Sequence, residues 1–182
     1  MAEIAFHPTP DAFYASTLLA LDELLGSLDG ERLYAICLQT DDGGMSVGLC
    51  ANTEEGYAEK RAEAEEAGDL DESYDAYLRW NSAEWRHEMT GWEHFKRIEQ
   101  DLSEEVEDPE GGFETYFEHL IDAMVDALAT LRSEREQALQ GVTLFVTITD
   151  SEETIEVEDR SATRLNPPEL SEPFLRRYDE AG

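Results

Sequence analysis

His87 and Glu88 are the residues that come nearest to a metal-binding motif in this chain. On a zinc-protease helix, such a pair is followed one turn later by a second histidine that shares the metal ion. The position where that histidine would stand is occupied by Gly91. The pattern therefore gives no support for a zinc site.

A run of polar residues resembles the early ligands of a calcium-binding loop: Asp69, Asp71, Ser73 and Asp75. Such a loop needs glycine at its sixth position for a sharp turn and a bidentate glutamate at its twelfth. Tyr74 and Trp80 stand at those two positions. A solvated acidic turn is the better interpretation, and we expect neither a metal ion nor a cofactor.

Nucleophilic chemistry has little support in the sequence. Cys37 and Cys50 lie inside apolar runs, and a reactive thiolate needs an exposed, electropositive setting that so acidic a chain opposes. We expect two reduced, buried thiols. Gly43-Gly44 lacks the Gly-Lys-Ser/Thr that follows in a phosphate-binding loop. No carboxylate pair for acid–base catalysis can be singled out among 44 acidic residues. We therefore expect a binding protein rather than an enzyme.

The three tryptophans, Trp80, Trp85 and Trp92, could line a ligand pocket or a protein interface, where large rings carry much of the binding energy. Core packing is the simpler interpretation, because Trp85, Met89 and Trp92 share one face of a predicted helix. Trp80 precedes that helix, and we expect it to be the more exposed of the three.

The charge of the chain is extreme, with 44 acidic and 13 basic residues and a formal net charge of -31 at pH 7. Nucleic acids and anionic membranes would be repelled, because clustered Lys and Arg are what bind them. Hydrophobic residues still make up 41%, so we expect a folded chain. The charge favours a cationic protein partner, or solubility in a salt-rich cell.

The start of the chain, Met1 to Pro10, lacks the basic residues and apolar stretch of a signal peptide. No segment approaches the roughly 18 consecutive apolar residues of a membrane span. Two cysteines give no disulfide framework for 182 residues. These features predict a cytoplasmic protein.

The first part of the chain predicts a helix followed by a β-hairpin. Thr9-Pro10-Asp11 is typical of a helix start, and Gly30 can end that helix. The apolar run 33–38 and the alternating segment 45–50 then flank Asp41-Asp42-Gly43-Gly44, whose glycines suit a tight turn.

Helices are predicted for the middle of the chain. Asn52 or Thr53 can cap an exposed, Ala- and Glu-rich helix that runs to Gly68. Asn81 resembles a helix cap, and the apolar residues after it predict a further helix to Leu102. The acidic segment 104–112 contains a proline and a glycine pair and predicts an exposed loop.

The strongest helical periodicity covers residues 113–128, and the alternation over 142–148 predicts a strand that pairs with the hairpin. Residues 154–165 fit a helix, although Ile155 and Val157 also fit a strand, and Asn166-Pro167-Pro168 ends either element.

Together these elements predict one α+β domain over residues 1–182, with an acidic helical insertion at about 52–80. A small, mostly antiparallel sheet, made of the hairpin and the later strand, would be covered on one face by several helices.

Three acidic clusters, at 63–75, 99–110 and 150–159, are the candidate partner-binding surfaces, although each is ordinarily a solvated face. The candidate residues are Asp69, Asp71, Glu72, Asp75 and the nearby Trp80, then Glu104, Glu105, Glu107 and Asp108, and finally Glu152 and Glu153.

Four sets of short motifs span most of the chain: Leu33 to Leu38, Ala51-Asn52-Thr53-Glu54-Glu55, Trp80 with Glu84-Trp85 and Glu88, and Ser161-Ala162 with Leu165-Asn166-Pro167. This pattern resembles the bacterial family called domain of unknown function 4303 (DUF4303). The resemblance carries over no catalytic residue. Such families are similar in size and acidity to the immunity proteins of polymorphic toxin systems, which block a toxin domain made by the same cell.

The resulting hypothesis is an immunity protein that neutralises a cationic toxin domain, such as a nuclease or a nucleotide-modifying transferase, by occluding its active site with carboxylates. Two alternatives remain open. One is a small-molecule-binding domain or enzyme with a Trp-lined pocket, and the other is a halophilic housekeeping domain.

Overall fold

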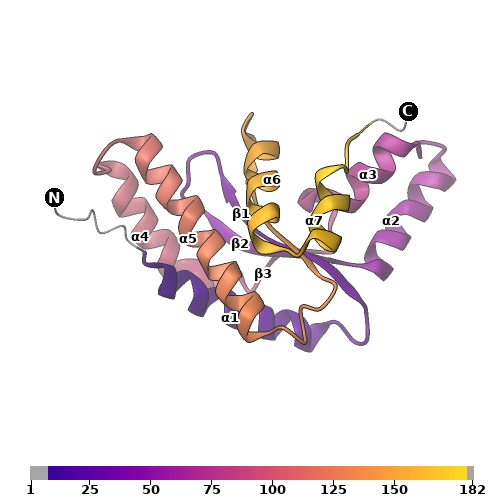
Figure 1. Cartoon of the computed structure of the whole chain (residues 1–182), viewed down its shortest axis with the longest axis horizontal. Helices are drawn as coiled ribbons and strands as arrows, with labels where there is room; N and C mark the ends of the chain where they lie inside the picture. Colours follow the sequence, from indigo (N-terminus) through magenta and orange to yellow (C-terminus); the bar gives the residue numbers. More distant parts are fainter. Residues whose placement is uncertain (1–7, 180–182) are drawn as a thin grey trace.

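A four-stranded sheet is the centre of the fold in the computed structural model, which describes residues 8–179 (Figure 1). Its order is β3-β2-β1-β4, where the strands are β1 (Leu33–Asp41), β2 (Val47–Thr53), β3 (His87–Thr90) and β4 (Thr143–Thr149). β2 pairs antiparallel with both β1 and β3, whereas β4 runs parallel to β1. The predicted hairpin and later strand are confirmed, and the sheet is mostly antiparallel.

Seven α-helices surround the sheet within residues 8–179: α1 (Pro10–Ser27), α2 (Glu54–Ala67), α3 (Glu72–Trp80), α4 (Lys96–Glu107), α5 (Phe113–Glu134), α6 (Thr154–Leu165) and α7 (Pro168–Leu175). Two short 3-10 turns, η1 (Ser82–Glu84) and η2 (Trp92–Phe95), flank β3. None of these described helices is long and apolar enough to cross a lipid bilayer.

Helices pack on both faces of the sheet, so the α+β class is confirmed but the prediction of one covered face is wrong. Ile36 and Val146 belong to a large cluster with residues of α1, α4 and α5. Cys37 and Phe145, their neighbours along the strands, point into a second cluster that includes Phe174 of α7. The unbroken apolar run of β1 is what a strand buried on both faces requires.

The capping residues place several elements as predicted. Thr9 accepts a hydrogen bond from the Ala12 N–H at 3.4 Å and caps α1. Thr53 caps α2, and Gly68 ends it in the left-handed conformation, with φ of 80°. α6 covers the predicted range 154–165, so the helical interpretation of that segment is confirmed over the strand.

The helix predicted from Asn81 to Leu102 is wrong, because η1, β3 and η2 precede α4 in this segment. Gly91 has φ of +64°, and a Cβ atom there would lie 2.8 Å from the Cα atom of Ala20 in α1. This close approach turns the chain sharply. Trp85 is buried as predicted, but Trp92 is 52% exposed.

Two helices were not predicted as separate elements, although α3 lies within the predicted helical insertion at about 52–80. α3 replaces the predicted acidic turn, and Asp71 caps it by accepting a hydrogen bond from the Tyr74 N–H at 2.8 Å. α7 begins at Pro168, a residue that ends one helix but also suits the first position of the next. α4 continues through Glu107, so the predicted loop is reduced to residues 108–112.

The outer edge of β4 is closed by side chains of α6 and the residue that follows it. The Asn166 side chain accepts from the Leu144 N–H at 2.8 Å and donates to the Leu144 carbonyl at 2.6 Å. Two residues further along the strand, the Ser161 hydroxyl accepts from the Val146 N–H at 2.9 Å. Successive outward-facing backbone groups of β4 are thus satisfied without a fifth strand.

Thr154 and Arg132 extend this side-chain pairing. The Thr154 hydroxyl donates to the Ile148 carbonyl at 2.7 Å. The Arg132 guanidinium donates to the Asn166 side-chain oxygen and to the Val142 carbonyl, both at 2.7 Å. An open strand edge is a template for association with other chains. Because these side chains already occupy the backbone groups at the outer edge of β4, the sheet ends at this strand.

We predict that Asn166→Ala lowers the free energy of unfolding by about 3 kcal/mol, because it leaves the buried N–H and carbonyl of Leu144 without partners. Urea unfolding followed by circular dichroism measures this change. Asn81→Ala is the control, since Asn81 caps only the short turn η1, and should cost about 1 kcal/mol. Equal costs for the two variants would contradict the proposed role of Asn166.

Candidate functional site

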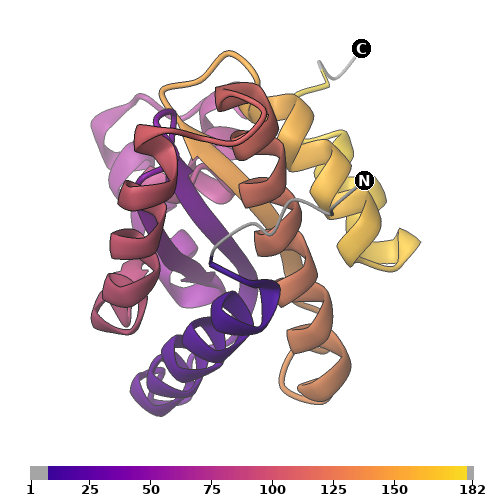
Figure 2. The same cartoon turned by 90° about the vertical axis from the view of Figure 1, so that its left-hand side faces the viewer.

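Three segments without Lys or Arg lie at one end of the molecule: the hairpin tip 42–46, the α4–α5 segment 104–118 and the β4–α6 segment 150–156. Figures 1 and 2 both show them at the top. We call this region the acidic end. Its acidic residues are Asp42, Glu104, Glu105, Glu107, Asp108, Glu110, Glu114, Glu118, Asp150, Glu152, Glu153 and Glu156.

The sheet topology brings the three segments together. β1 and β4 are parallel and remain in register to Asp41 and Thr149, so the hairpin tip and the β4–α6 connection leave the sheet at the same edge. α5 begins at this edge as well, because the Tyr116 hydroxyl donates a hydrogen bond to the Gly44 carbonyl at 2.5 Å. Gly44 has φ of +66°, and a Cβ atom there would approach the Tyr116 ring to 3.0 Å.

Asp41 fixes the shape of the hairpin tip. Its carboxylate accepts hydrogen bonds from the Ser46 N–H at 2.8 Å, from the Met45 N–H at 3.3 Å and from the Ser46 hydroxyl. Partial burial acts to raise the pKa of Asp41, but the hydrogen bonds from Ser46, Met45 and Gly43 outweigh it and hold the pKa below its ordinary value. Asp41 is therefore a structural carboxylate inside the acidic end.

Each of the three segments exposes one large apolar side chain. Met45 of the hairpin tip is 49% exposed, Phe113 at the start of α5 is 46% exposed and Ile155 in α6 is 54% exposed. Close by, a small cavity of about 220 Å³ between α5 and α6 is lined by Phe117, Ile121 and acidic side chains, among others. Apolar residues surrounded by a polar rim are the usual composition of a protein–protein interface.

Two helix N-termini help the acidic end to hold its charge. α5 and α6 both begin there, with Glu114 and Glu156 in their first turns. The partial positive charge of a helix N-terminus stabilises carboxylates in the first turn by a few tenths to about 1 kcal/mol each. These helix N-termini partly offset the repulsion among the carboxylates, and Arg160 of α6 lines the small cavity beside Glu118, Glu153 and Glu156.

The structure brings two of the three predicted clusters together and separates the third. Glu104, Glu105, Glu107 and Asp108 of the second cluster share the acidic end with Glu152 and Glu153 of the third. The first cluster lies on α2 and α3, to the right of those segments in Figure 1. Tyr77 of α3 lines a cavity with Asp150 and Thr154, so the end of α3 borders the β4–α6 segment.

Basic residues neutralise part of the α2–α3 cluster. Arg61 pairs with Asp75 at 3.0 Å, and Glu54 in the first turn of α2 pairs with Arg79 at 2.9 Å. Asp75 also accepts a hydrogen bond from the Tyr57 hydroxyl at 2.6 Å. Asp71 is occupied as the cap of α3, so Asp69 and Glu72 are the exposed acidic candidates left there.

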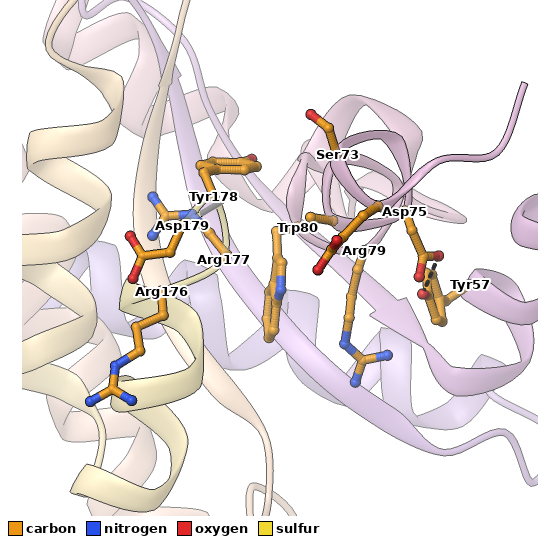
Figure 3. A pocket seen from close by; sticks show the side chains of 11 residues that line it. Tyr57, Ser73, Asp75, Arg79, Trp80, Arg176, Arg177, Tyr178 and Asp179 are labelled. Atoms are coloured by element: carbon orange, nitrogen blue, oxygen red, sulfur yellow. Dashed lines mark hydrogen bonds between the residues drawn. The ribbon is translucent and has the colours of Figure 1, made fainter. Parts of the chain in front are cut away.

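Trp80 does not belong to the acidic end; it lies in a separate pocket of about 610 Å³ between α3 and the chain after α7 (Figure 3). Its ring is partly buried and makes an edge contact with Phe174, with centroids 5.1 Å apart. Arg79, Arg176 and Tyr178 also line this pocket. The prediction that Trp80 is the most exposed tryptophan is wrong, since Trp92 protrudes further.

Arg79 and two aromatic residues fix the end of α3 against the sheet. The Arg79 guanidinium lies over the Tyr34 ring at 4.2 Å and forms two hydrogen bonds with Glu54, of 2.9 and 3.2 Å. The Tyr34 hydroxyl and the Trp85 indole N–H both donate to the Arg79 carbonyl, at 2.5 and 3.0 Å. They satisfy a carbonyl that the end of a helix leaves without a partner.

Glu158 and Arg177 form a buried ion pair beneath the same region, 2.8 Å apart. The Thr147 hydroxyl donates to the other Glu158 oxygen at 2.6 Å. Burial raises the pKa of Glu158 despite these partners. The pair anchors the segment after α7, which carries Arg176 and Tyr178, to α6.

The two cysteines lie on neighbouring strands of the sheet. Cys37 and Cys50 are free, buried and directly opposite each other on β1 and β2, which confirms the prediction of buried thiols. Burial raises the pKa of Cys37. Within residues 8–179, no group of three or more His, Cys, Asp or Glu side chains is arranged to hold a metal ion.

Several residues of these two sites were not predicted from the sequence. Met45, Phe113 and Ile155 fit the apolar periodicity of their segments, so nothing in the pattern marks them as exposed. Arg176 and Tyr178 belong to the segment after α7, for which no element was predicted. Their only signal was compositional, since Arg176-Arg177 is a basic pair in a chain with 13 basic residues.

Comparison with known proteins gives one match. The model of a family described as a domain of unknown function (DUF4303) matches residues 13–167, a range that includes all four sets of motifs named above. No curated protein and no solved structure matches the chain.

We predict that Asp41→Asn lowers the free energy of unfolding by about 1 kcal/mol at neutral pH, because the partly buried carboxylate loses charge-assisted hydrogen bonds. Since the pKa of Asp41 is lower in the folded state, its contribution is present above the unfolded pKa of about 3.9 and is lost as the pH falls through the folded pKa. The difference between wild type and variant should therefore shrink below about pH 4.

Denaturant unfolding of both proteins across this pH range measures the effect. Asp42→Asn is the matched control, because the exposed Asp42 side chain makes none of the hydrogen bonds that Asp41 makes. We expect the control to change stability by less than about 0.5 kcal/mol at any pH. A constant difference for Asp41→Asn down to pH 2, about two units below the unfolded pKa, would contradict the assignment.

Proposed function

The chain belongs to the DUF4303 family, and from this premise we propose that it is an immunity protein that binds and neutralises a cationic bacterial toxin domain made by the same cell. The acidic end is the binding surface. The target is a domain that handles phosphate-rich substrates, such as a nuclease or a nucleotide-modifying transferase, and therefore carries Arg and Lys in its active site. Binding occludes that cleft.

The observation that carries the proposal is the combination of uncompensated acids and exposed apolar side chains at one end. The acidic end holds no Lys or Arg in its three segments, while Met45, Phe113 and Ile155 protrude from it. Carboxylates would steer a basic partner and fix its orientation, because complementary potentials raise the association rate. The apolar side chains would supply affinity, since buried anchors surrounded by polar groups dominate most interfaces.

The uneven distribution of charge favours this proposal over a general adaptation to salt. Adaptation to salt would spread acidic residues over the surface as a whole. In this chain, Asp75 of α3 pairs with Arg61 and Glu54 of α2 pairs with Arg79, whereas the three segments of the acidic end contain no Lys or Arg. The surface thus offers a partner one strongly negative end.

We predict that removing five charges from the acidic end abolishes protection against the toxin domain. The variant combines Glu104→Gln, Glu107→Gln, Asp108→Asn, Glu152→Gln and Glu153→Gln, all at exposed positions. It is co-expressed with the candidate toxin domain encoded in the adjacent reading frame. Wild type should restore growth and the variant should not. The affinity of the variant for the toxin domain should fall by about 100-fold or more at physiological salt. The association rate constant should fall as well, because the charges that steer the partner have been removed.

The matched control removes five charges from α2, α3 and their connection: Glu63→Gln, Glu65→Gln, Glu66→Gln, Asp69→Asn and Glu72→Gln, which are also exposed. It should still protect, with an affinity within about threefold of wild type, because screened charges more than about 8 Å from a partner contribute little. A second variant, Phe113→Ser, keeps every charge and should speed dissociation. The proposal fails if the reading frame is harmless alone, or if both five-charge variants protect equally.

A further inference from the structure

Arg176 has no polar partner among residues 8–179. Within residues 8–179, each of the other Lys and Arg side chains except Arg160 makes an ion pair or a hydrogen bond. The two exceptions are exposed, and both line a cavity: Arg160 the small one beside the acidic end, and Arg176 the pocket of Trp80. In a chain with 44 acids and 13 bases, a guanidinium without a carboxylate is available to a ligand.

The pocket that Arg176 lines also contains an aromatic ring, that of Trp80. Trp80 stands between Arg79 on one side and Arg176 on the other in Figure 3. Arg79 lies over the Trp80 ring at 5.4 Å and is already held by Glu54. Trp80 lines the cavity, whose volume of about 610 Å³ is within the range for small-molecule sites.

Hydrogen-bonding groups of both kinds surround the Trp80 ring. The Trp80 indole N–H and the Ser73 hydroxyl line the pocket and make no hydrogen bond within the described residues. Glu72 and Asp179 are exposed carboxylates of the same lining without a basic partner in that range. A ligand for this pocket therefore needs a flat ring, one anionic group and several hydroxyl or amino donors.

We propose that this pocket binds a nucleoside monophosphate. The base stacks on Trp80, the phosphate pairs with Arg176 and the ribose hydroxyls donate to Glu72 or Asp179. Arginine binds phosphate by two parallel hydrogen bonds, aromatic rings stack on bases, and acidic side chains accept from ribose hydroxyls in other nucleotide sites. Because Arg176 is the arginine of this pocket without a polar partner among residues 8–179, and the net charge of the chain is -31, one phosphate is favoured over a polyphosphate.

The site goes beyond the proposed function and is independent of it. None of its lining residues belongs to the acidic end. The sequence left open the alternative of a small-molecule-binding domain with a Trp-lined pocket. The proposal of a nucleoside monophosphate assigns a ligand class to that pocket. The two proposals can be tested separately, because one concerns a protein partner and the other a free nucleotide.

The test is calorimetric titration of the purified chain with AMP, GMP, CMP and UMP, compared with adenosine, ribose 5-phosphate and ATP. At least one monophosphate should bind with a dissociation constant below about 1 mM. Adenosine and ribose 5-phosphate should bind at least about tenfold more weakly, because each lacks one of the two main contacts. ATP should bind no more tightly than AMP.

Arg176→Gln and Arg160→Gln form a matched pair, since both replace an exposed arginine that has no polar partner among residues 8–179. Arg176→Gln should weaken the best monophosphate by about tenfold or more, and Arg160→Gln should leave its affinity unchanged. Circular dichroism spectra of both variants should match the spectrum of the wild type, which checks that both variants fold. The proposal is overturned if no monophosphate binds below about 1 mM, if ribose 5-phosphate binds as tightly as AMP, or if the two variants bind equally.

Discussion

The hydrogen bonds between the open edge of β4 and the side chains beside it are the constraint on which the rest of the structure depends. A parallel strand at the edge of a sheet presents a row of backbone groups that must find partners. Asn166, Ser161 and Thr154 supply those partners at Leu144, Val146 and Ile148, every second residue of the strand. The spacing of these side chains fixes how α6 lies along β4.

This arrangement of α6 positions both candidate sites. Because α6 must run along the edge of β4, its N-terminus stands next to the hairpin tip, and the acidic segment before it joins the acidic end. Its opposite end leads directly into α7, and the buried pair of Glu158 and Arg177 then holds the following segment against α6. Arg176 reaches the Trp80 pocket for that reason. One packing geometry thus sets the position of two chemically different surfaces.

The sequence predicted the elements whose signals are local. Thr9, Thr53 and Gly68 marked helix boundaries correctly because each satisfies backbone groups of its own helix. The segment from Asn81 to Leu102 was misread because the conformation of Gly91 depends on the close approach of Ala20, a residue far away in the sequence. The second covered face was missed as well, although Cys37 and Phe145 are apolar, because period-two patterns do not show which helices pack on a strand.

The sequence identified the acidic candidate residues, but it did not show which of them lie together in the fold. Six acidic candidates fall together only because β1 and β4 are parallel, a topology that no local pattern reports. Three of the scarce basic residues are taken up inside the fold: Arg177 neutralises Glu158, Arg79 closes α3 against the sheet, and Arg132 binds carbonyls next to Asn166. The three segments of the acidic end contain no Lys or Arg, so the acidic end bears self-repulsion that helix N-termini, the neighbouring Arg160 and solvent ions reduce. A basic partner docked there would relieve that repulsion directly. The electrostatic gain on binding would therefore be largest at the end of the molecule where the apolar side chains are already exposed.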